Sequence, residues 1–557
     1  MTSGSAYRKS AAPASSEGES RTRTGLGIRE RVSNAWNDLL SRPLTDYIML
    51  LCIVVILSCL GVVMVYSSSM TWSLQEGGSV WGTALRQGVM IVLGFVAMWI
   101  ALMIRPQTIR NLAPAFLVVA IILLLAVQVP GIGTGREEVG SQSWIVLGPI
   151  QFQPSEIAKV AIAVWGAHYL AGKGQAEHWF FNHHMKFAAV GGFMTVLIFL
   201  EGDAGMAVSF VLVVLFMLFF AGIAMGWMAL AGLLMAAALV VLAVGGGFRS
   251  NRFEVYFDAL FGNFQDVRGI AFQSYQGFLS LADGAGLGVG LGQSRAKWFY
   301  LPEAKNDFIF AIIGEELGLL GGALVIALFA GLLYFGLRTA KRSHDPFLSL
   351  MAATLTAAVS SQALINIGYV VGLLPVTGIQ LPMISAGGTS AVITLASMGL
   401  LISCARHEPE AVSAMASYGR PPIDRLLGLK EPSSELTRSN APRRTKKEPT
   451  ASKAAKESKA SQQRFGQPVT ARTKTRSDAT PRRDNLRREE PRANPRSNPR
   501  TDPRMDARGG RSGTSNATGR GATGSVRKQS ENNPPRPDAR KRGGPDDSGR
   551  WNDRYRR

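Results

Sequence analysis

Long apolar stretches separated by short polar segments dominate the chain before residue 405. A helix of about 20 apolar residues crosses a lipid bilayer, and a soluble helical protein could bury one such helix but not ten. The pattern therefore predicts an all-α integral membrane protein with about ten transmembrane helices. The expected spans are residues 47–66, 87–104, 112–129, 157–170, 187–200, 204–225, 227–244, 308–337, 347–371 and 391–404.

Lys and Arg collect in alternate connections between these stretches. The basic connections lie near 29–31, 105–110, 171–186 and 338–344. Cytoplasmic loops of membrane proteins carry an excess of Lys and Arg, so these connections and both termini are predicted to be cytoplasmic. The long connection at 245–306, between the seventh and eighth helices, then lies on the extracytoplasmic side.

The net charge of +21 over 557 residues is concentrated at one end of the chain. Residues 405–557 hold 37 Lys and Arg against 18 Asp and Glu, so they carry +19 of it. This part is rich in Pro, Arg, Ser, Gly and Asn, and such a composition buries too little apolar area to fold. We expect a cytoplasmic segment over 1–44, a membrane domain over 45–404, and a disordered basic tail over 405–557.

The tail's positive charge would attract anionic lipid headgroups or an acidic protein partner. Lipid is the simpler expectation, because the tail is tethered at the inner leaflet. No specific nucleic-acid binding is expected, since no recognition module is visible in the sequence.

The extracytoplasmic connection holds a run of alternating glycines at 284, 286, 288, 290 and 292. The spacing superficially matches a dinucleotide-binding loop, but that motif needs a strand before it and a soluble βαβ unit around it. Glycines here are better explained by close approach of the backbone to a ligand or a neighbouring helix. Charged side chains follow at Arg295, Lys297, Glu303, Lys305 and Asp307.

Four stretches of the chain resemble the SEDS family (shape, elongation, division and sporulation). They are LGVGLGQSRAKWFYLPEAKNDFIFAIIGEELGLLG at 287–321, FQPSEIAK at 152–159, EGDAG at 201–205 and NIGYVVGLLPVTGIQLPMISAGGTS at 366–390. The resemblance spans about 45–404. It implies a peptidoglycan glycosyltransferase that polymerises lipid II into glycan strands. The sequence motifs LPEA and NDFIFAIIGEELG are more similar to the division branch of the family than to the elongation branch.

The resemblance also implies a location. Members of the division branch are multi-pass proteins of the bacterial plasma membrane, found at the division septum, with the active site on the extracytoplasmic face. Lipid II is the implied substrate. The implied partners are a class B penicillin-binding protein, which is a transpeptidase, and other divisome proteins.

Asp307 is the catalytic residue that the resemblance implies, because it is the acid just before FIFA. A carboxylate there could take the proton from the acceptor sugar's hydroxyl as the new glycosidic bond forms. The residues alone also allow a simpler role. Asn306 or Asp307 could cap the helix that follows, since Asn and Asp are common at that position.

Cationic groups must stabilise the diphosphate that leaves the donor. We assign this role to Arg295 and Lys297, with Lys159 and a divalent cation (Mg or Mn) as further candidates; the metal's ligands are unknown. The other predicted substrate-binding residues are Gln153, Ser155, Glu156, Glu303 and Lys305. Ser155 or Glu156 could equally cap a helix, and Glu156 and Lys159 could simply pair as i, i+3 neighbours.

Glu315, Glu316 and Asp203 are predicted to support the site within the membrane. A charged acid there is costly unless it pairs with a cation or faces a polar cavity. Pairing with Lys159 or Arg86 and a direct role in substrate handling are both open for the two glutamates.

The segment around Gly387 and Gly388 suggests broken backbone, which is tolerated at membrane depth where protein or water satisfies the amides. Those amides could meet phosphate, or the segment could be a tight turn. Two other function classes stay open: a lipid II flippase, which would use similar charges and broken helices, and a non-enzymatic division scaffold.

Overall fold

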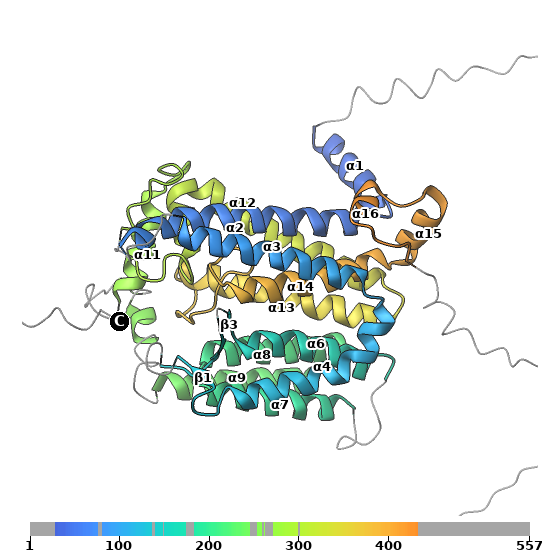
Figure 1. Ribbon diagram of the computed structural model, residues 1–557, viewed down its shortest axis with the longest axis horizontal. Helices are drawn as coiled ribbons and strands as arrows, with labels where there is room; N and C mark the ends of the chain where they lie inside the picture. The colour runs from blue at the N-terminus through green and yellow to red at the C-terminus, as the bar shows by residue number, and fades with distance from the viewer. Residues whose placement is uncertain are drawn as a thin grey trace, which may run out of the picture. The chain divides into compact units, whose positions relative to one another are not determined.

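The computed structural model describes residues 28–75, 81–135, 140–148, 150–173, 183–244, 253–258, 261, 271–298 and 301–432. Disorder was predicted for the tail over 405–557, and residues 433–557 of it lie outside the described residues. The prediction was wrong for 405–432, where Pro409–Tyr418 and Pro422–Leu426 are helical and buried Asp424 pairs with Arg406 at 2.8 Å. Helices account for most of the rest (Figure 1). In chain order they are α1 (Ile28–Ser41), α2 (Thr45–Gln75), α3 (Gly82–Met103), α4 (Pro106–Ala126), α6 (Pro154–Leu170), α7 (His183–Leu200), α8 (Ala204–Phe220), α9 (Met225–Val244), α11 (Phe272–Asp283), α12 (Ile309–Arg342), α13 (Pro346–Val370), α14 (Thr389–Arg406), α15 (Pro409–Tyr418) and α16 (Pro422–Leu426).

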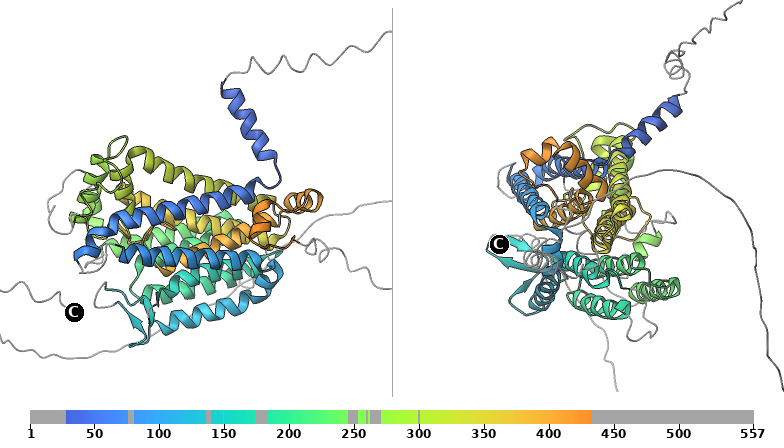
Figure 2. Two further views of the ribbon diagram at one scale, coloured as in Figure 1. Left: turned by 45° about the horizontal axis from the view of Figure 1, so that its top comes forward. Right: turned by 90° about the vertical axis from the view of Figure 1, so that its right-hand side faces the viewer.

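The long helices form two groups that run side by side. Helices α2, α3, α12, α13 and α14 make up one group, and α4, α6, α7, α8 and α9 make up the other (Figures 1 and 2). Helix α13 joins them, because it packs on α12 and α14 and also on α6 and α8. Most of its side chains are buried in consequence.

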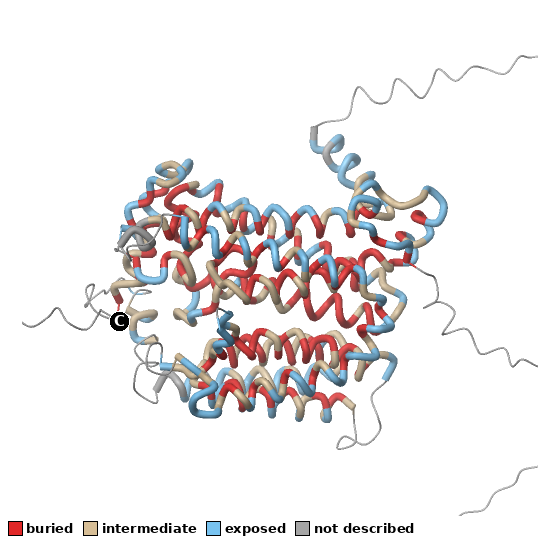
Figure 3. Tube along the Cα trace, viewed as in Figure 1, coloured by how far each residue is buried: buried red, intermediate tan, exposed pale blue. Residues whose placement is uncertain are grey.

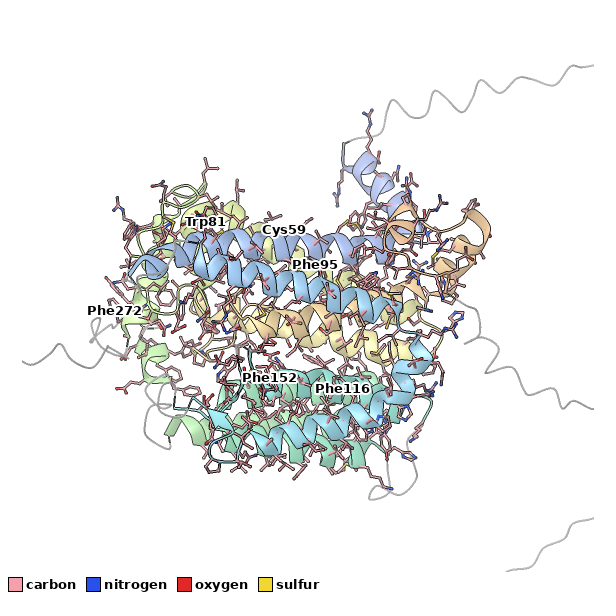
Figure 4. All side chains as sticks on the ribbon, viewed as in Figure 1. Cys59, Trp81, Phe95, Phe116, Phe152 and Phe272 are labelled. Atoms are coloured by element: carbon pink, nitrogen blue, oxygen red, sulfur yellow. The ribbon has the colours of Figure 1, made fainter. Side chains whose placement is uncertain are left out.

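Apolar side chains cover both the inside and the outside of the bundle. Figure 3 shows buried positions where helices face one another and exposed positions on the opposite faces. Many exposed residues are large and apolar, such as Val92, Ile122 and Leu324. Cys59, Phe95 and Phe116 lie along the shafts of α2, α3 and α4 (Figure 4). Because water would penalise such a surface, it indicates helices that face lipid.

Each of the ten predicted spans coincides with one of these helices. Among the described residues, seven helices are long and apolar enough to cross a membrane: α2, α3, α4, α7, α12, α13 and α14. Two further helices, α8 and α9, are also apolar, but their apolar stretches are shorter. The prediction of a helical, multi-pass membrane protein is confirmed, whereas ten crossings and two cytoplasmic termini stay predictions.

Helix α2 extends about nine residues beyond its predicted end at Tyr66. The run of serines after that residue suggested an end to the apolar span. The structure continues the helix because these serines are buried, and Ser67 donates from its hydroxyl to Glu316 at 2.7 Å. A partner from another helix thus makes polar residues acceptable inside the bundle.

A small antiparallel sheet is an addition to the all-α prediction. Its strands are β1 (Gly133–Thr134), β2 (Trp144–Leu147) and β3 (Ile150–Phe152), in the order β1-β2-β3. In Figure 1, β3 lies between α14 above and α6 and α8 below. The sheet thereby brings the connection between α4 and α6 to the junction of the two helix groups.

Helix α12 is interrupted at Gly318, where φ is 67° and ψ is −166°. The glycine-rich loop at 284–292 packs against this interruption. A Cβ atom at Gly288 would lie 2.2 Å from the Glu316 carbonyl oxygen, and one at Gly284 would lie 1.9 Å from that of Gly314. Only glycine allows this approach, so the prediction that the glycines meet a neighbouring helix is confirmed for Gly284 and Gly288.

Candidate active site

Asp307 lies directly before α12 and is partly buried. The cap position of the helix belongs to Phe308, which has no side-chain oxygen to bond the first amides. Asn306 instead donates from its side chain to the Glu303 carboxylate at 2.6 Å. Neither Asn306 nor Asp307 occupies the cap position that the simpler interpretation gave them.

A cavity of about 490 Å³ opens beside this turn. Its volume is in the range of pockets that hold small ligands. Arg86 and Lys305 supply two positive charges, and no acid is among the described residues that line it. The lining consists of Gly82, Thr83, Arg86, Gln87, Met90, Trp144, Gln151, Lys305, Asn306, Gln380, Ala386, Gly387, Gly388 and Thr389.

Hydrogen bonds between distant segments hold the walls of the cavity together. The Gln87 side chain, on α3, donates to the Ser385 carbonyl at 3.2 Å. Thr389, at the start of α14, donates to the Gln151 carbonyl on β3 at 2.7 Å. Residues 379–388 run between them without regular helix, as predicted for this segment. The cavity therefore exists only because α3, the sheet and the start of α14 meet.

Lys159 and Glu156 form an ion pair of 3.0 Å near the start of α6, and both are buried. Lys159 also donates to the Gln362 side chain at 2.7 Å, and Gln362 donates to the Gln380 carbonyl in the cavity wall at 3.1 Å. The pairing alternative is what the structure shows. The Lys159 cluster supports the wall of the cavity, and Lys159 itself is not among the lining residues.

Gln153, at the cap position of α6, donates to the Asp203 carboxylate at 3.1 Å. Asp203 caps α8 by accepting from the Met206 amide at 2.9 Å. Burial raises the pKa of Asp203, while these two hydrogen bonds act in the opposite direction. Ser155 is buried, and its hydroxyl has no hydrogen-bond partner among the described residues.

Glu315 and Glu316 hold the end of the glycine-rich loop against α12. The Glu315 carboxylate accepts from the Ser294 hydroxyl at 2.7 Å and from the Arg295 amide at 2.6 Å. Glu316 pairs with Lys297 at 3.2 Å, and neither side chain is exposed. The expected partners Lys159 and Arg86 were wrong, because the loop folds back and brings Lys297 to the helix.

This arrangement does not fit the diphosphate-binding role predicted for Lys297, since its ammonium group is enclosed and paired. Arg295 and Glu303 are exposed. Of the predicted substrate-binding residues, Lys305 alone lines the cavity within the described residues.

Glu201, between α7 and α8, is an additional buried acid that sequence reasoning did not single out. Its side chain is 3% exposed, and neither carboxylate oxygen has a hydrogen-bond partner among the described residues. Burial, reinforced by the nearby Asp203 charge, raises the pKa of Glu201 to about 9. The folded protein therefore keeps Glu201 protonated at neutral pH.

Replacing Glu201 by Gln is expected to stabilise the protein increasingly as pH rises from about 4.5 to about 9. In that range the unfolded chain loses the Glu201 proton while the folded chain retains it, so rising pH lowers wild-type stability. The difference in free energy of unfolding between Glu201→Gln and wild type grows by up to about 1.4 kcal/mol per pH unit. Thermal unfolding in detergent at pH 5, 7 and 9 measures it. Glu254 is exposed, so Glu254→Gln is the control. If the stabilities of wild type and Glu201→Gln changed in parallel with pH, the prediction would be contradicted.

The sequence of the membrane domain matches a known protein family over most of its length. A family model described as "Cell cycle protein" and covering FtsW, RodA and SpoVE matches residues 47–410. The chain belongs to this family. The resemblance to SEDS proteins is thereby confirmed.

Individual relatives agree with this assignment. The chain is 40% identical over 425 residues to a "Probable peptidoglycan glycosyltransferase FtsW" of Mycobacterium tuberculosis. This match covers 76% of this chain and 78% of the relative. It is 34% identical to "Stage V sporulation protein E" of Bacillus subtilis, over 65% of this chain and 97% of the relative. A chain in a solved structure described as "Structural coordination of polymerization and crosslinking by a peptidoglycan synthase complex" has the same fold, with a TM-score of 0.51 and 24% identity over 65% of this chain and 97% of that one.

Sequence reasoning missed most of the cavity lining, and Arg86 is the residue it should have found. This Arg lies at the end of α3 that the predicted orientation places outside. Outer ends of membrane helices are poor in Lys and Arg, so a basic residue there indicates a function or a buried partner. Trp144 and Gln151 carried no comparable signal, because their strands were not predicted.

Proposed function

We propose that this protein is a peptidoglycan glycosyltransferase that polymerises lipid II into glycan strands during septal cell-wall synthesis. The observation that carries the proposal is the placement of Asp307 directly after Lys305 and Asn306, which line a cationic cavity whose described lining residues include no acid. Relatives named peptidoglycan glycosyltransferase support the reaction class.

The chemistry divides between the acid and the cavity. Asp307 accepts the proton of the acceptor sugar's hydroxyl while that oxygen attacks the donor's anomeric carbon, a contribution of about 100- to 10,000-fold in rate. The bond to the diphosphate breaks at the same carbon, so negative charge develops on the leaving group. Arg86 and Lys305 stabilise that charge from the cavity wall.

The start of α14 adds to this positive environment. Gly387 and Gly388 precede the helix, and both line the cavity. The first amides of a helix carry partial positive charge and favour anions. Together with Arg86 and Lys305, they make the cavity suited to a diphosphate.

The predicted divalent cation finds less support in these side chains. No group of three or more His, Cys, Asp or Glu that could hold a metal ion occurs within the described part of the chain. The lining of the cavity offers cations and neutral oxygens, which fit an anion better than Mg or Mn. No step of the proposed reaction is therefore assigned to a metal.

The same proposal includes the side of the membrane that the site faces, the place of the protein in the cell and its partners. The site faces the extracytoplasmic side of the plasma membrane, where the positive-inside pattern puts the loop before α12. The protein works at the division septum with a class B penicillin-binding protein and other divisome proteins. A solved fold relative belongs to a complex described as coordinating polymerization and crosslinking, which is the type of assembly expected here. The tail contacts anionic lipid, or else an acidic partner.

Purified full-length protein, combined with a class B penicillin-binding protein from the same organism, tests the reaction. Lipid II is supplied in detergent, where no membrane separates two compartments, and strand length is read on gels. Glycan strands are expected. Translocation of lipid II headgroups in vesicles without strand growth would instead establish the flippase alternative, and absence of both activities would favour a scaffold.

Replacing Arg86 by Gln is expected to raise KM for lipid II by about 10- to 100-fold. Hydrogen bonds to charged groups contribute about 1.5 to 3 kcal/mol, and each 1.4 kcal/mol is tenfold in affinity. Steady-state polymerisation rates against lipid II concentration measure the change. Arg105→Gln, exposed at the start of α4, is the matched control. An unchanged KM would remove Arg86 from substrate binding.

A further inference from the structure

The backbone carbonyl of Asp307 is held by two buried side chains of α13. Asn366 approaches it with its amide nitrogen at 2.9 Å, and Tyr369 with its hydroxyl at 3.0 Å. Asn366 has no exposed surface, and Tyr369 is 2% exposed. Neither residue is among those that line the cavity. Their contact is with the backbone of the candidate catalytic residue, so they are placed to act through it.

The same two side chains also hold the wall of the cavity. The amide nitrogen of Asn366 and the hydroxyl of Tyr369 each lie 2.7 Å from the Ile379 carbonyl. The next residue, Gln380, lines the cavity. One pair of side chains therefore connects the segment that carries Asp307 with the segment that forms the wall.

The proton count shows that the pair works as a unit. The Asn366 amide has two protons and the Tyr369 hydroxyl has one, and the two groups are themselves 2.6 Å apart. These three protons serve two carbonyl oxygens and the phenol oxygen. The nitrogen of Asn366 must face this site, because an oxygen there would meet two carbonyl oxygens that cannot donate. Removing the Tyr369 hydroxyl takes away one of the three protons and removing the Asn366 amide takes away two, so either change leaves too few donors for the two carbonyls.

Neighbouring bonds fix the two residues before Asp307 in the same way. The Ser385 hydroxyl donates to the Asn306 carbonyl at 2.7 Å, and the Ala386 amide donates to the Lys305 carbonyl at 3.0 Å. Three successive carbonyls therefore face the 379–386 segment and α13. The backbone at Asp307 has little freedom to move relative to the cavity.

We propose that Asn366 and Tyr369 are positioning residues, which set the distance between the Asp307 carboxylate and the sugar hydroxyl of a substrate bound in the cavity. This inference rests on the proposed glycosyltransferase function. Displacement of a reacting group by about 1 Å can cost about 100-fold in rate, even when the mutated residue is remote from the chemistry. The pair acts on the chemical step through the Asp307 backbone, whereas the cation Arg86 stands on a different helix, α3.

The test uses full-length Tyr369→Phe and Asn366→Leu with lipid II and the transpeptidase partner. Tyr369→Phe retains the ring, which packs 5.7 Å from that of Phe308, and removes one donor. We expect kcat to fall about 10-fold for Tyr369→Phe and about 100-fold for Asn366→Leu. KM should stay within about twofold, and the pH profile of kcat should keep its shape because the base is unchanged.

Tyr47→Phe is the matched control, because it also removes a buried tyrosine hydroxyl. Tyr47 donates to Asp424 at 2.6 Å, far along α2 from the cavity. It should lose stability without losing kcat. Hydrogen exchange gives a second measurement: residues 301–308 and 379–388 should exchange faster together in the two α13 variants and not in Tyr47→Phe.

Several results would overturn the inference. They are an unchanged kcat in both α13 variants, a raised KM with kcat retained, or a loss of kcat in Tyr47→Phe equal to that in Tyr369→Phe. An active wild type with unaffected variants overturns the positioning role alone, whereas an inactive wild type overturns the proposed function together with it.

Discussion

Replacing Asp307 by Asn is expected to lower the rate of strand synthesis by about 100- to 10,000-fold, the usual range for losing a general base. Asn has nearly the same shape and retains the backbone carbonyl that Asn366 and Tyr369 hold. Because the cap position of α12 belongs to Phe308, the substitution removes no helix cap. Lipid II polymerisation by the purified complex measures the loss.

Asp283→Asn provides the matched control for this substitution. Asp283 ends α11 and is exposed, so it should retain full activity. Both variants should unfold at the wild-type temperature. Strand synthesis by a well-folded Asp307→Asn protein at more than about a tenth of the wild-type rate would exclude the general-base role.

Breaking the Lys297–Glu316 pair is expected to have the largest effect on stability. Removing one partner of a buried ion pair costs about 3 to 5 kcal/mol, because the other charge is left in a low-dielectric interior. Lys297→Met and Glu316→Gln should each show this loss in unfolding experiments in detergent. The double variant should recover most of it, since neither charge of the pair is then left without its partner.

The mostly exposed Glu410, which pairs with Arg342, is a useful comparison. Glu410→Gln should cost less than about 1 kcal/mol, as exposed ion pairs contribute little. If the losses of the two buried single variants simply added in the double variant, the pair would not be coupled, and the proposed bracing of the loop at 292–297 would be incorrect.

The helices were predictable because each apolar run is a local property of the chain. Residues 347–371, for example, became α13 almost to the residue. Local chemistry also identified the region that matters, since acids and glycines in an apolar context are unusual. The glycines of the loop and the charged residues after it were named from such patterns, whereas the catalytic role of Asp307 came from the family resemblance. The end of α2 was missed because Ser67 donates to Glu316, which is 249 residues away.

The sequence by itself determined a helical membrane protein, its basic tail and the family of its membrane domain, because hydrophobic length, charge and motifs can be read one segment at a time. Only the tertiary structure decided which groups meet. Glu316 took Lys297 as its partner, Lys159 met Gln362, and Arg86 joined Lys305 at the cavity. Such pairings depend on how α3, α12 and α13 pack and where the loops fold back, and no single segment contains that information.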